Sequence, residues 1–329
     1  MFCFRLTFFW LFSILKIQKF KEKTMSKRLP IIIDADPGID DALAMLIAFA
    51  NPKRFDIKLI TAAVGNKSLA LSVRNSLFLV DKFAKYDIPV ARGEDHTYDD
   101  KEEKNDASDV HGKWGLGDFR APTTKKKCLR GDVADIMYEK IMESSEKIVL
   151  VGMGPFTNFA KLLEKHPDAK SKIAYIFAMG ASVDGKGNIT KFAEFNVHHD
   201  PVAFDMVLKS GVKLIISPLH LARETANDDR IYTGHRAKTD KEKFIYDLFD
   251  GSYEPSQPGR FCVHDAYTIH GLLRPKLYRF EPCTITVSLK PETYGQTFIK
   301  LNPKGKFLVQ LSNNKNKIRK KMYKDIYKK

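Results

Sequence analysis

The chain has 329 residues, of which 43% are hydrophobic and 29% charged, and its formal net charge is +15 at pH 7. This composition is that of an ordinary globular protein with ample length for a large core. The positive charge crowds residues 16–28 and 313–329, and no interleaved basic and aromatic motif occurs, so a nucleic-acid partner is not expected. Both terminal charge runs are expected to be solvated, mobile segments.

The N-terminus and the cysteines bear on where the protein resides. An apolar run, MFCFRLTFFWLFSILKI, occupies residues 1–17; it is short for a membrane span, and no signal-peptide cleavage site follows it. Met25 opens MSKRLPIIID, a natural start for a cytoplasmic protein. Residues 1–24 are therefore either the product of a wrongly assigned start codon or an uncleaved membrane anchor. The four widely spaced cysteines form no C-x-x-C pair and no zinc spacing, which favours a reduced protein of the cytoplasm.

From residue 29 onward, short apolar runs rich in β-branched residues alternate with segments of helical period. The runs predict buried strands and the segments predict helices. In chain order these are strand 29–34, helix 40–50, strand 56–65, helix 68–84, strand 147–154, helix 157–166, strand 172–180 and strand 212–219. The alternation predicts an α/β fold with a doubly wound, mostly parallel open sheet flanked by helices, which is Rossmann-like. Two stretches without clear period, 93–125 and 223–265, are expected to be lids or binding loops.

Small or polar clusters follow the predicted strands. They are DADPGIDD at 34–41, Gly65–Asn66, GMGPFTN at 152–158, MGA at 179–181 and SPL at 217–219. Because ligands bind outside the carboxyl ends of the strands in open α/β sheets, these clusters are expected to meet at one rim. That rim is the predicted active site.

The first cluster places four carboxylates within eight residues, at Asp34, Asp36, Asp40 and Asp41. The helix dipole stabilises acids in the first turn of a helix, which accounts for Asp40 and Asp41 without any ligand. It does not account for two further acids at the end of a buried strand. A hard cation would offset the repulsion, and ligation by oxygen alone favours Ca²⁺ or Mg²⁺. Asp34 is expected to orient its neighbours through hydrogen bonds.

Two classes of enzyme open with an apolar strand followed by D-x-D. Phosphotransferases of the haloacid dehalogenase type use D-x-D-x-[TV] with Mg²⁺, but Gly38 stands where Thr or Val is expected. The pattern DADPGIDDA at 34–42 instead resembles the opening motif of the nucleoside hydrolases. Other segments resemble further motifs of that family in the same order: Gly65–Asn66, GPFTN at 154–158, Met179–Gly180, AEFN at 193–196 and His264–Asp265. Residues from about 29 to 305 are thus similar to the inosine-uridine preferring type of nucleoside N-ribohydrolase.

The resemblance implies a nucleoside hydrolase domain over residues 25–312, between an apolar and basic extension (1–24) and a basic tail (313–329). It implies a Ca²⁺-dependent enzyme that hydrolyses the N-glycosidic bond of pyrimidine or mixed inosine and uridine ribonucleosides. The products would be ribose and a free base, for nucleoside salvage. A homotetramer or homodimer is expected, with no membrane partner unless the N-terminal apolar run is a real anchor.

The resemblance also implies roles for individual residues. Ca²⁺ would be bound by the carboxylates of Asp36, Asp41 and Asp265 and by the backbone carbonyl of Thr157. Asp36 would also take the proton of the attacking water, and His264 would protonate the leaving base. The implied substrate-binding residues are Asp40, Asn66, His111, Met179, Glu194, Asn196, Tyr253 and Asp265.

Three positions depart from the family pattern, and two other functions stay open at this point. Ala222 and Arg223 follow the PL of the last predicted strand, where threonine and histidine or lysine are usual, and Trp114 stands in the HGxxGLG segment. The bulky ring of Trp114 would narrow the base pocket or anchor its own loop. The open alternatives are a Mg²⁺-dependent phosphatase and a catalytically inactive protein that binds nucleosides or sugars.

Overall fold

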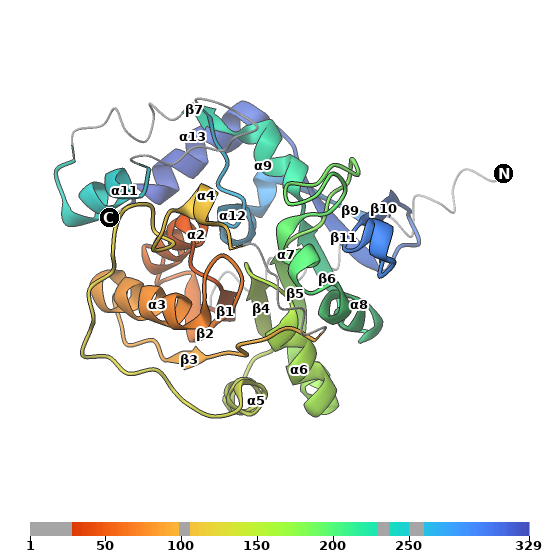
Figure 1. Ribbon diagram of the computed structural model, residues 1–329, viewed down its shortest axis with the longest axis horizontal. Helices are drawn as coiled ribbons and strands as arrows, with labels where there is room; N and C mark the ends of the chain where they lie inside the picture. Colours follow the sequence, from red (N-terminus) through yellow and green to blue (C-terminus); the bar gives the residue numbers. More distant parts are fainter. Residues whose placement is uncertain (1–27, 99–105, 229–236, 250–259, 329) are drawn as a thin grey trace.

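The computed structural model describes residues 28–98, 106–228, 237–249 and 260–328. Its centre is a nine-stranded sheet in the order β10-β9-β11-β6-β5-β4-β1-β2-β3 (Figure 1). The strands are β1 (Leu29–Ala35), β2 (Phe55–Ala62), β3 (Val90–Arg92), β4 (Ile148–Gly152), β5 (Ile173–Met179), β6 (Leu214–Ser217), β9 (Tyr278–Val287), β10 (Thr297–Leu301) and β11 (Phe307–Ser312). Strand β9 runs antiparallel to β10 and β11, and the other neighbours pair in parallel. The predicted mostly parallel sheet is confirmed.

The order of the strands reverses at the middle of the sheet. Strands β2 and β3 lie on one side of β1, whereas β4, β5 and β6 lie on the other side in sequence order. Strands β1 and β4 are direct parallel neighbours, with Ile33 opposite Val151. Reversals of this kind open a crevice outside the carboxyl ends of the two strands. The fold therefore places a ligand site where β1 and β4 end.

Helices cover both faces of the sheet. The longer ones are α2 (Ile39–Phe49), α3 (Leu69–Phe83), α5 (Val133–Glu143), α6 (Thr157–Lys165), α8 (Pro201–Lys209), α9 (Leu219–Thr225), α11 (Asp240–Phe249), α12 (Ala266–Leu273) and α13 (Lys315–Ile326). Short elements are α4 (Ser108–His111), α7 (Phe195–His199), the 3₁₀ turns η1 (Pro167–Ser171), η2 (Pro275–Leu277) and η3 (Pro291–Thr293), and the small ribbon of β7 (Asn227–Asp228) and β8 (Arg260–Phe261).

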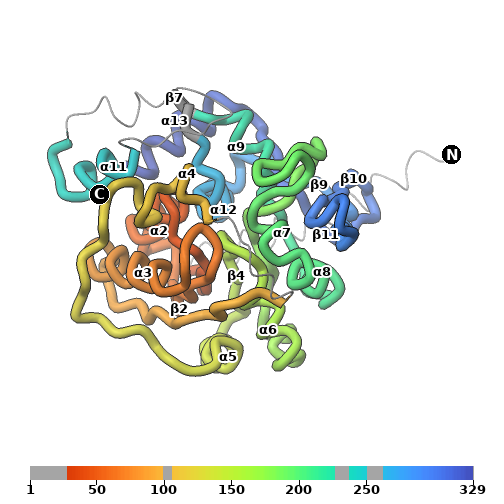
Figure 2. The backbone as a smooth tube through the Cα atoms, in the orientation of Figure 1, coloured from red at the N-terminus to blue at the C-terminus, as the bar shows by residue number. Residues whose placement is uncertain are grey.

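Burial on both faces explains the composition of the central strand. Ile31 and Ile33 of β1 enter a core shared with α2, α3, α9, α11, α12 and α13, whereas Ile32 enters a core shared with α5, α6 and α8. A strand covered on both faces is apolar without alternation, as β1 is. Helix α2 is buried along its whole length, because it lies between the sheet and the helices α12 and α13 (Figure 2). Its apolar sequence reflects that position.

The predicted strands and helices from residue 29 to 219 are present in the structure. Each stretch that lacked clear period contains a helix, α4 in residues 93–125 and α11 in residues 223–265. Strand β3, at one edge of the sheet, was not predicted. The strands β9, β10 and β11 were not predicted either. They extend the parallel sheet beyond β6, so the last part of the chain belongs to the same fold.

The C-terminal segment differs from the expectation of a solvated basic tail. Residues Lys315–Ile326 form α13, and Ile318, Met322 and Ile326 are buried against the first core. These three residues recur every four positions and so line one face of the helix. The expectation was wrong because the many lysines occupy the other faces of the same helix.

The apolar run at residues 1–17 lies outside the described residues. In the described part of the chain, no helix is both long enough and apolar enough to cross a membrane.

Candidate active site

The turn between β1 and α2 lies at the predicted rim and carries the carboxylate cluster. Asp36 follows the last residue of β1, and its Oδ2 accepts a hydrogen bond of 2.6 Å from the backbone N–H of Asn66 after β2. Gly65 permits this approach, because a Cβ at that position would lie 2.0 Å from Asp36 Oδ2. The Gly65–Asn66 pair therefore holds the Asp36 carboxylate in position.

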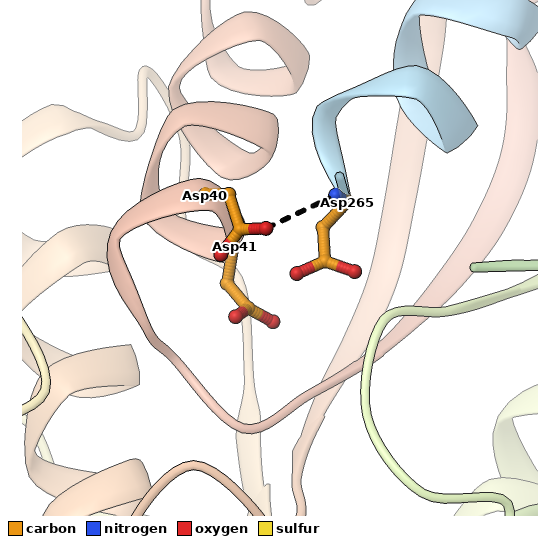
Figure 3. A group of neighbouring side chains, drawn as sticks. All are labelled: Asp40, Asp41 and Asp265. Atoms are coloured by element: carbon orange, nitrogen blue, oxygen red, sulfur yellow. Dashed lines mark hydrogen bonds between the residues drawn. The ribbon is translucent and has the colours of Figure 1, made fainter. Parts of the chain in front are cut away.

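Three further carboxylates meet between the N-terminal ends of α2 and α12 (Figure 3). Asp40 and Asp41 lie in the first turn of α2, and Asp265 is the residue before α12. One ligand oxygen from each of the three lies within 4.8 Å of the others. The backbone N–H of Asp265 donates to Asp40 Oδ2 over 3.4 Å, across 225 residues of sequence. Packing of α12 against α2 thus completes the cluster.

Asn66 links the two halves of the cluster. Its Nδ2 donates to the backbone carbonyl of Asp36 at 3.1 Å and to Asp41 Oδ2 at 3.2 Å. The same oxygen of Asp41 accepts from the backbone N–H of Gly38 at 3.0 Å. The side-chain amide of Asn66 therefore fixes one oxygen of Asp41 and directs the other away from these donors.

The carboxylates of the cluster are buried and repel one another, and a bound cation would offset this repulsion. Burial, followed by repulsion from Asp40, raises the pKa of Asp41 to about 8. Burial and neighbouring carboxylates also raise the pKa of Asp36 and of Asp265 well above the ordinary value. One buried oxygen on each of Asp36, Asp40, Asp41 and Asp265 accepts no hydrogen bond from the part of the chain that the structure describes. Buried carboxylate oxygens without donors are suited to bind a hard metal ion.

This set overlaps the predicted metal ligands without coinciding with them. Asp41 and Asp265 belong to the tight group of three, and the third member is Asp40 rather than Asp36. Asp36 lies near enough to be affected by the charges of Asp41 and Asp40. Thr157 is buried at the start of α6, and its Oγ1 donates to Asp200 Oδ2 at 2.6 Å.

A second group of predicted residues gathers beyond β4 and β5. The Glu194 carboxylate accepts from the backbone N–H groups of Asn196, Val197 and Ala181 at 2.9, 3.0 and 3.1 Å, and so caps α7. Burial raises the pKa of Glu194, and these hydrogen bonds oppose the rise. Asn196 Nδ2 donates to the Met153 carbonyl at 3.0 Å and to the sulfur of Met179 at 3.4 Å. Met179, Glu194 and Asn196 are all buried.

Two predicted histidines lie near the carboxylates of Asp40 and Asp265. His111 ends α4, and its Nδ1 lies 3.2 Å from the backbone nitrogen of Ile39 and 4.0 Å from Asp40 Oδ1. Burial lowers the pKa of His111. His264 is partly buried next to Asp265, and it lies near enough to His111 and Glu194 for a positive charge on it to lower the pKa of both. Tyr253, also predicted to reach the substrate, lies outside the described residues.

Two of the departures from the family pattern have structural partners away from the carboxylates. The ring of Trp114 is covered by the guanidinium of Arg120, 4.5 Å from the ring centroid, and by the Lys113 ammonium at 5.1 Å. The backbone carbonyl of Trp114 accepts from Asn75 at 2.9 Å. Arg223 donates to the carbonyl of Gly187 at 2.8 Å. Trp114 therefore anchors its own loop, and Arg223 holds the loop before Glu194.

Buried acids beneath the rim hold the GPFTN segment in place. Asp34 Oδ1 accepts from Thr61 Oγ1 and from Asn158 Nδ2, the latter at 2.7 Å. Burial raises the pKa of Asp34 to about 7, and both hydrogen bonds oppose the rise. Asp200 accepts from Thr157 on the other side. Asp34 does accept hydrogen bonds, but from Thr61 and Asn158 rather than from its neighbours in the carboxylate cluster, so the expected role differs from the one that the structure shows.

Asn158, Asp200 and Lys67 are residues that sequence reasoning did not single out. Asn158 was visible in the GPFTN segment, where Thr157 alone received a role. Asp200 precedes Pro201, and an acid before proline is a signal for a helix start. Lys67 follows Asn66 and gave no signal, because a lysine in a loop is ordinarily solvated.

Comparison with known proteins gives concordant results. The family description "inosine-uridine preferring nucleoside hydrolase" matches residues 31–325. The non-specific ribonucleoside hydrolase RihC of Escherichia coli O127:H6 is 32% identical over 276 residues, which cover 84% of this chain and 89% of that protein. Among solved structures, a purine-preferring ribonucleoside hydrolase from Gardnerella vaginalis aligns with a TM-score of 0.81 and 26% identity, over 90% of this chain and 98% of the other. A plant nucleoside hydrolase aligns with a TM-score of 0.84 and 24% identity, over 91% and 98%, which shows the same fold.

Proposed function

Since the chain belongs to the inosine-uridine preferring nucleoside hydrolase family, and is thus a ribonucleoside hydrolase, we propose that it depends on Ca²⁺ and accepts both purine and pyrimidine bases. Its products, ribose and a free base, would serve nucleoside salvage in the cytoplasm. The mixed base preference rests on the relative that is named non-specific. Family membership removes the phosphatase alternative.

The observation that carries the proposal is the set of four buried carboxylates outside the ends of β1 and β4, each with one oxygen that accepts no hydrogen bond from the described residues. Three of them, Asp40, Asp41 and Asp265, bring a ligand oxygen within 4.8 Å of one another. Carboxylates of Asp36, Asp41 and Asp265, with the carbonyl of Thr157, offer oxygen alone, which suits Ca²⁺. When bound, the ion would offset their repulsion and polarise a water molecule. We assign Asp40 to the sugar, because its Oδ2 already accepts from the Asp265 N–H.

We assign the role of general base to Asp36. Its Oδ2 is held by the Asn66 N–H, and its Oδ1 accepts no hydrogen bond from the described residues. A carboxylate fixed through one oxygen can accept the proton of an attacking water through the other. Departure of the base leaves positive charge on the ribose ring, and buried carboxylates beside the ring stabilise that charge.

Ribose recognition is assigned to Asp40, Asn66, Glu194 and Asn196. The side-chain nitrogen of Asn66 donates to Asp36 and Asp41, so its side-chain oxygen, Oδ1, is the atom left to accept from a sugar hydroxyl. Charged and amide oxygens that are buried and shaped for hydroxyl groups discriminate strongly against sugars that lack them. We therefore assign 2′-hydroxyl selectivity to this group.

Protonation of the leaving base is assigned to His264. The residue is partly buried next to Asp265, and histidine titrates in the range that general acids need. His111 and Met179 are assigned to the base pocket, as is Tyr253, which lies outside the described residues.

The experiment that tests the proposal measures ribose release with a reducing-sugar assay. Inosine, adenosine, uridine, cytidine and their 2′-deoxy forms are compared after treatment with a chelator and after addition of Ca²⁺ or Mg²⁺. We expect ribose release from purine and pyrimidine ribonucleosides, its loss with chelator, its return with Ca²⁺, and little cleavage of the deoxy forms. Binding of nucleosides without release would show an inactive binder. Full activity in chelator, or equal recovery with Mg²⁺, would contradict the choice of Ca²⁺.

A further inference from the structure

Lys67 is buried, which is unusual for a charged side chain. Its side chain is only 3% exposed, and Asn66 before it is buried as well. Its ammonium group donates to Asp106 Oδ2 at 3.2 Å and to Ser108 Oγ. The Asp106 side chain is 54% exposed, so its charge offsets the desolvation of the lysine only in part. An ion pair with one buried and one exposed member is a poor source of stability, but it fixes the position of the groups that it joins.

The contacts of Lys67 fix the start of α4. The backbone N–H of Ala107 donates to the carbonyl of Asn66 at 3.1 Å, next to the Lys67 contacts. Asp106 Oδ1 also accepts from the Ser108 N–H at 3.1 Å. Residues 106–108 are therefore held by the Asn66–Lys67 dipeptide, of which Asn66 at the same time holds the carboxylates of the site.

The other end of α4 carries His111. Its backbone N–H donates to the carbonyl of Ala107 at 2.8 Å, so one helical turn joins the anchored residues to the histidine. The imidazole lies against Gly38, where a Cβ would be 2.8 Å from Nδ1. The Ile39 N–H, an amide that the first turn of α2 leaves without a helical partner, points at that Nδ1 from 3.2 Å. A nitrogen that accepts from an N–H carries no proton, so the ring proton of the neutral imidazole is on Nε2.

We propose that Lys67 is a positioning residue, which holds residues 106–108 so that His111 meets the start of α2 through Nδ1 and offers Nε2–H to the substrate. The role of His111 toward substrate rests on the proposed function. Lys67 itself touches neither the substrate nor the carboxylates. It acts through His111, so its effect on turnover requires that imidazole.

A double-mutant cycle tests this dependence. Lys67→Met keeps the aliphatic stem and removes the ammonium group, and Lys82→Met, which breaks the exposed pair of Lys82 with Asp240 at 2.7 Å, is the matched control. We expect Lys67→Met to lower kcat/KM by on the order of 10- to 100-fold, with an unchanged Ca²⁺ requirement. In the His111→Ala background the same change should cost less than about twofold, because coupled residues are not additive. Equal losses in both backgrounds, or no loss from His111→Ala alone, would overturn the proposal.

A readout that needs no turnover separates this proposal from the proposed function. Side-chain ¹⁵N spectra of His111, assigned by its loss in His111→Ala, report which ring nitrogen carries the proton. We expect the Nε2–H form in the wild type and the Lys82→Met control, and a mixture in Lys67→Met. If Lys67→Met does not fold, Ser108→Ala, which removes one acceptor of the ammonium group, takes its place in both experiments. An unaltered His111 spectrum in a folded variant would overturn the proposal even if the wild type releases no ribose.

Discussion

Asp41→Asn should stabilise the metal-free protein while it removes the response to Ca²⁺. The Asn oxygen can replace Asp41 Oδ2, which accepts from Gly38 N–H and Asn66 Nδ2. The amide nitrogen then takes the place of Oδ1, which accepts no hydrogen bond from the described residues, and it can donate to a neighbouring carboxylate such as Asp265. The substitution thus removes a repelled charge and supplies a donor.

The magnitude follows from the shift in the pKa of Asp41. A rise from the ordinary value of 3.8 to about 8 sets an upper limit of about 6 kcal/mol at 1.4 kcal/mol per pKa unit. Burial is the largest cause of the shift and repulsion from Asp40 the next, and the asparagine that replaces Asp41 is still a buried polar group, so only part of the limit is regained. We therefore expect a gain of about 2 to 3 kcal/mol in the free energy of unfolding near pH 8.

The direction in which the stability of the metal-free protein changes with pH follows from the same pKa shift. An acid whose pKa is higher in the folded state binds its proton more tightly there, so it favours folding at low pH and opposes it as pH rises toward 8. Metal-free wild type should therefore lose stability between about pH 4 and pH 8, and Asp41→Asn should lose less. Saturating Ca²⁺ should remove most of the loss in the wild type, because the ion favours the charged form.

The assay is urea unfolding followed by circular dichroism, at pH 5 and pH 8, with chelator or with Ca²⁺. Asp205→Asn, which removes a surface acid paired with Lys209, serves as the control and should keep the Ca²⁺ response. A metal-free Asp41→Asn protein less stable than wild type at pH 8 would refute the reasoning. So would a Ca²⁺-dependent stabilisation of Asp41→Asn equal to that of the wild type.

Four further variants test separate parts of the molecule. Asp36→Asn should lower kcat by several orders of magnitude in a folded protein, and near-normal ribose release would remove Asp36 as the base. His264→Ala should slow nucleosides far more than p-nitrophenyl riboside, whose leaving group needs little protonation; equal losses in the two kcat values would indicate positioning instead. Asp325→Asn should cost about 2 kcal/mol in urea unfolding at pH 7, because it breaks a half-buried bidentate pair with Arg274 at 2.7 and 2.8 Å, in which only Asp325 is fully buried. Burial opposes ionisation of Asp325, but hydrogen bonds led by Arg274 outweigh it and hold its pKa low. The difference in free energy of unfolding between wild type and Asp325→Asn should therefore shrink below about pH 4, and a constant difference would contradict the ion pair. Ala181→Gly should raise the free energy of unfolding by about 1 kcal/mol, since Ala181 has a φ of +64°; a loss of stability would show that the methyl group matters more than the strain.

The chain's local patterns were enough to predict five strands of the parallel part of the sheet, though not the three-residue β3 at its edge. Apolar runs such as 29–34 cannot be exposed, and their alternation with helical segments leaves few arrangements other than a doubly wound sheet. The acids of the first turn likewise indicated a cation site, because repulsion among neighbours in sequence does not depend on the rest of the fold. Helix α13 could also have been found, from the spacing of Ile318, Met322 and Ile326.

Local patterns could not decide which distant residues meet, and only the family resemblance grouped Asp265 with Asp36 and Asp41. Asp265 joins Asp40 and Asp41 only because α12 packs beside α2, and that contact depends on the whole order of the strands. Lys67 is an ion-paired, buried residue because residues 106–108 fold over it, and a lysine in a turn carries no local sign of such a partner. Local patterns encode periodicity and charge, whereas the pairing of side chains far apart in the chain is set by packing. The carboxylates were therefore predictable from sequence, and the lysine that holds His111 beside them was decided by the tertiary structure alone.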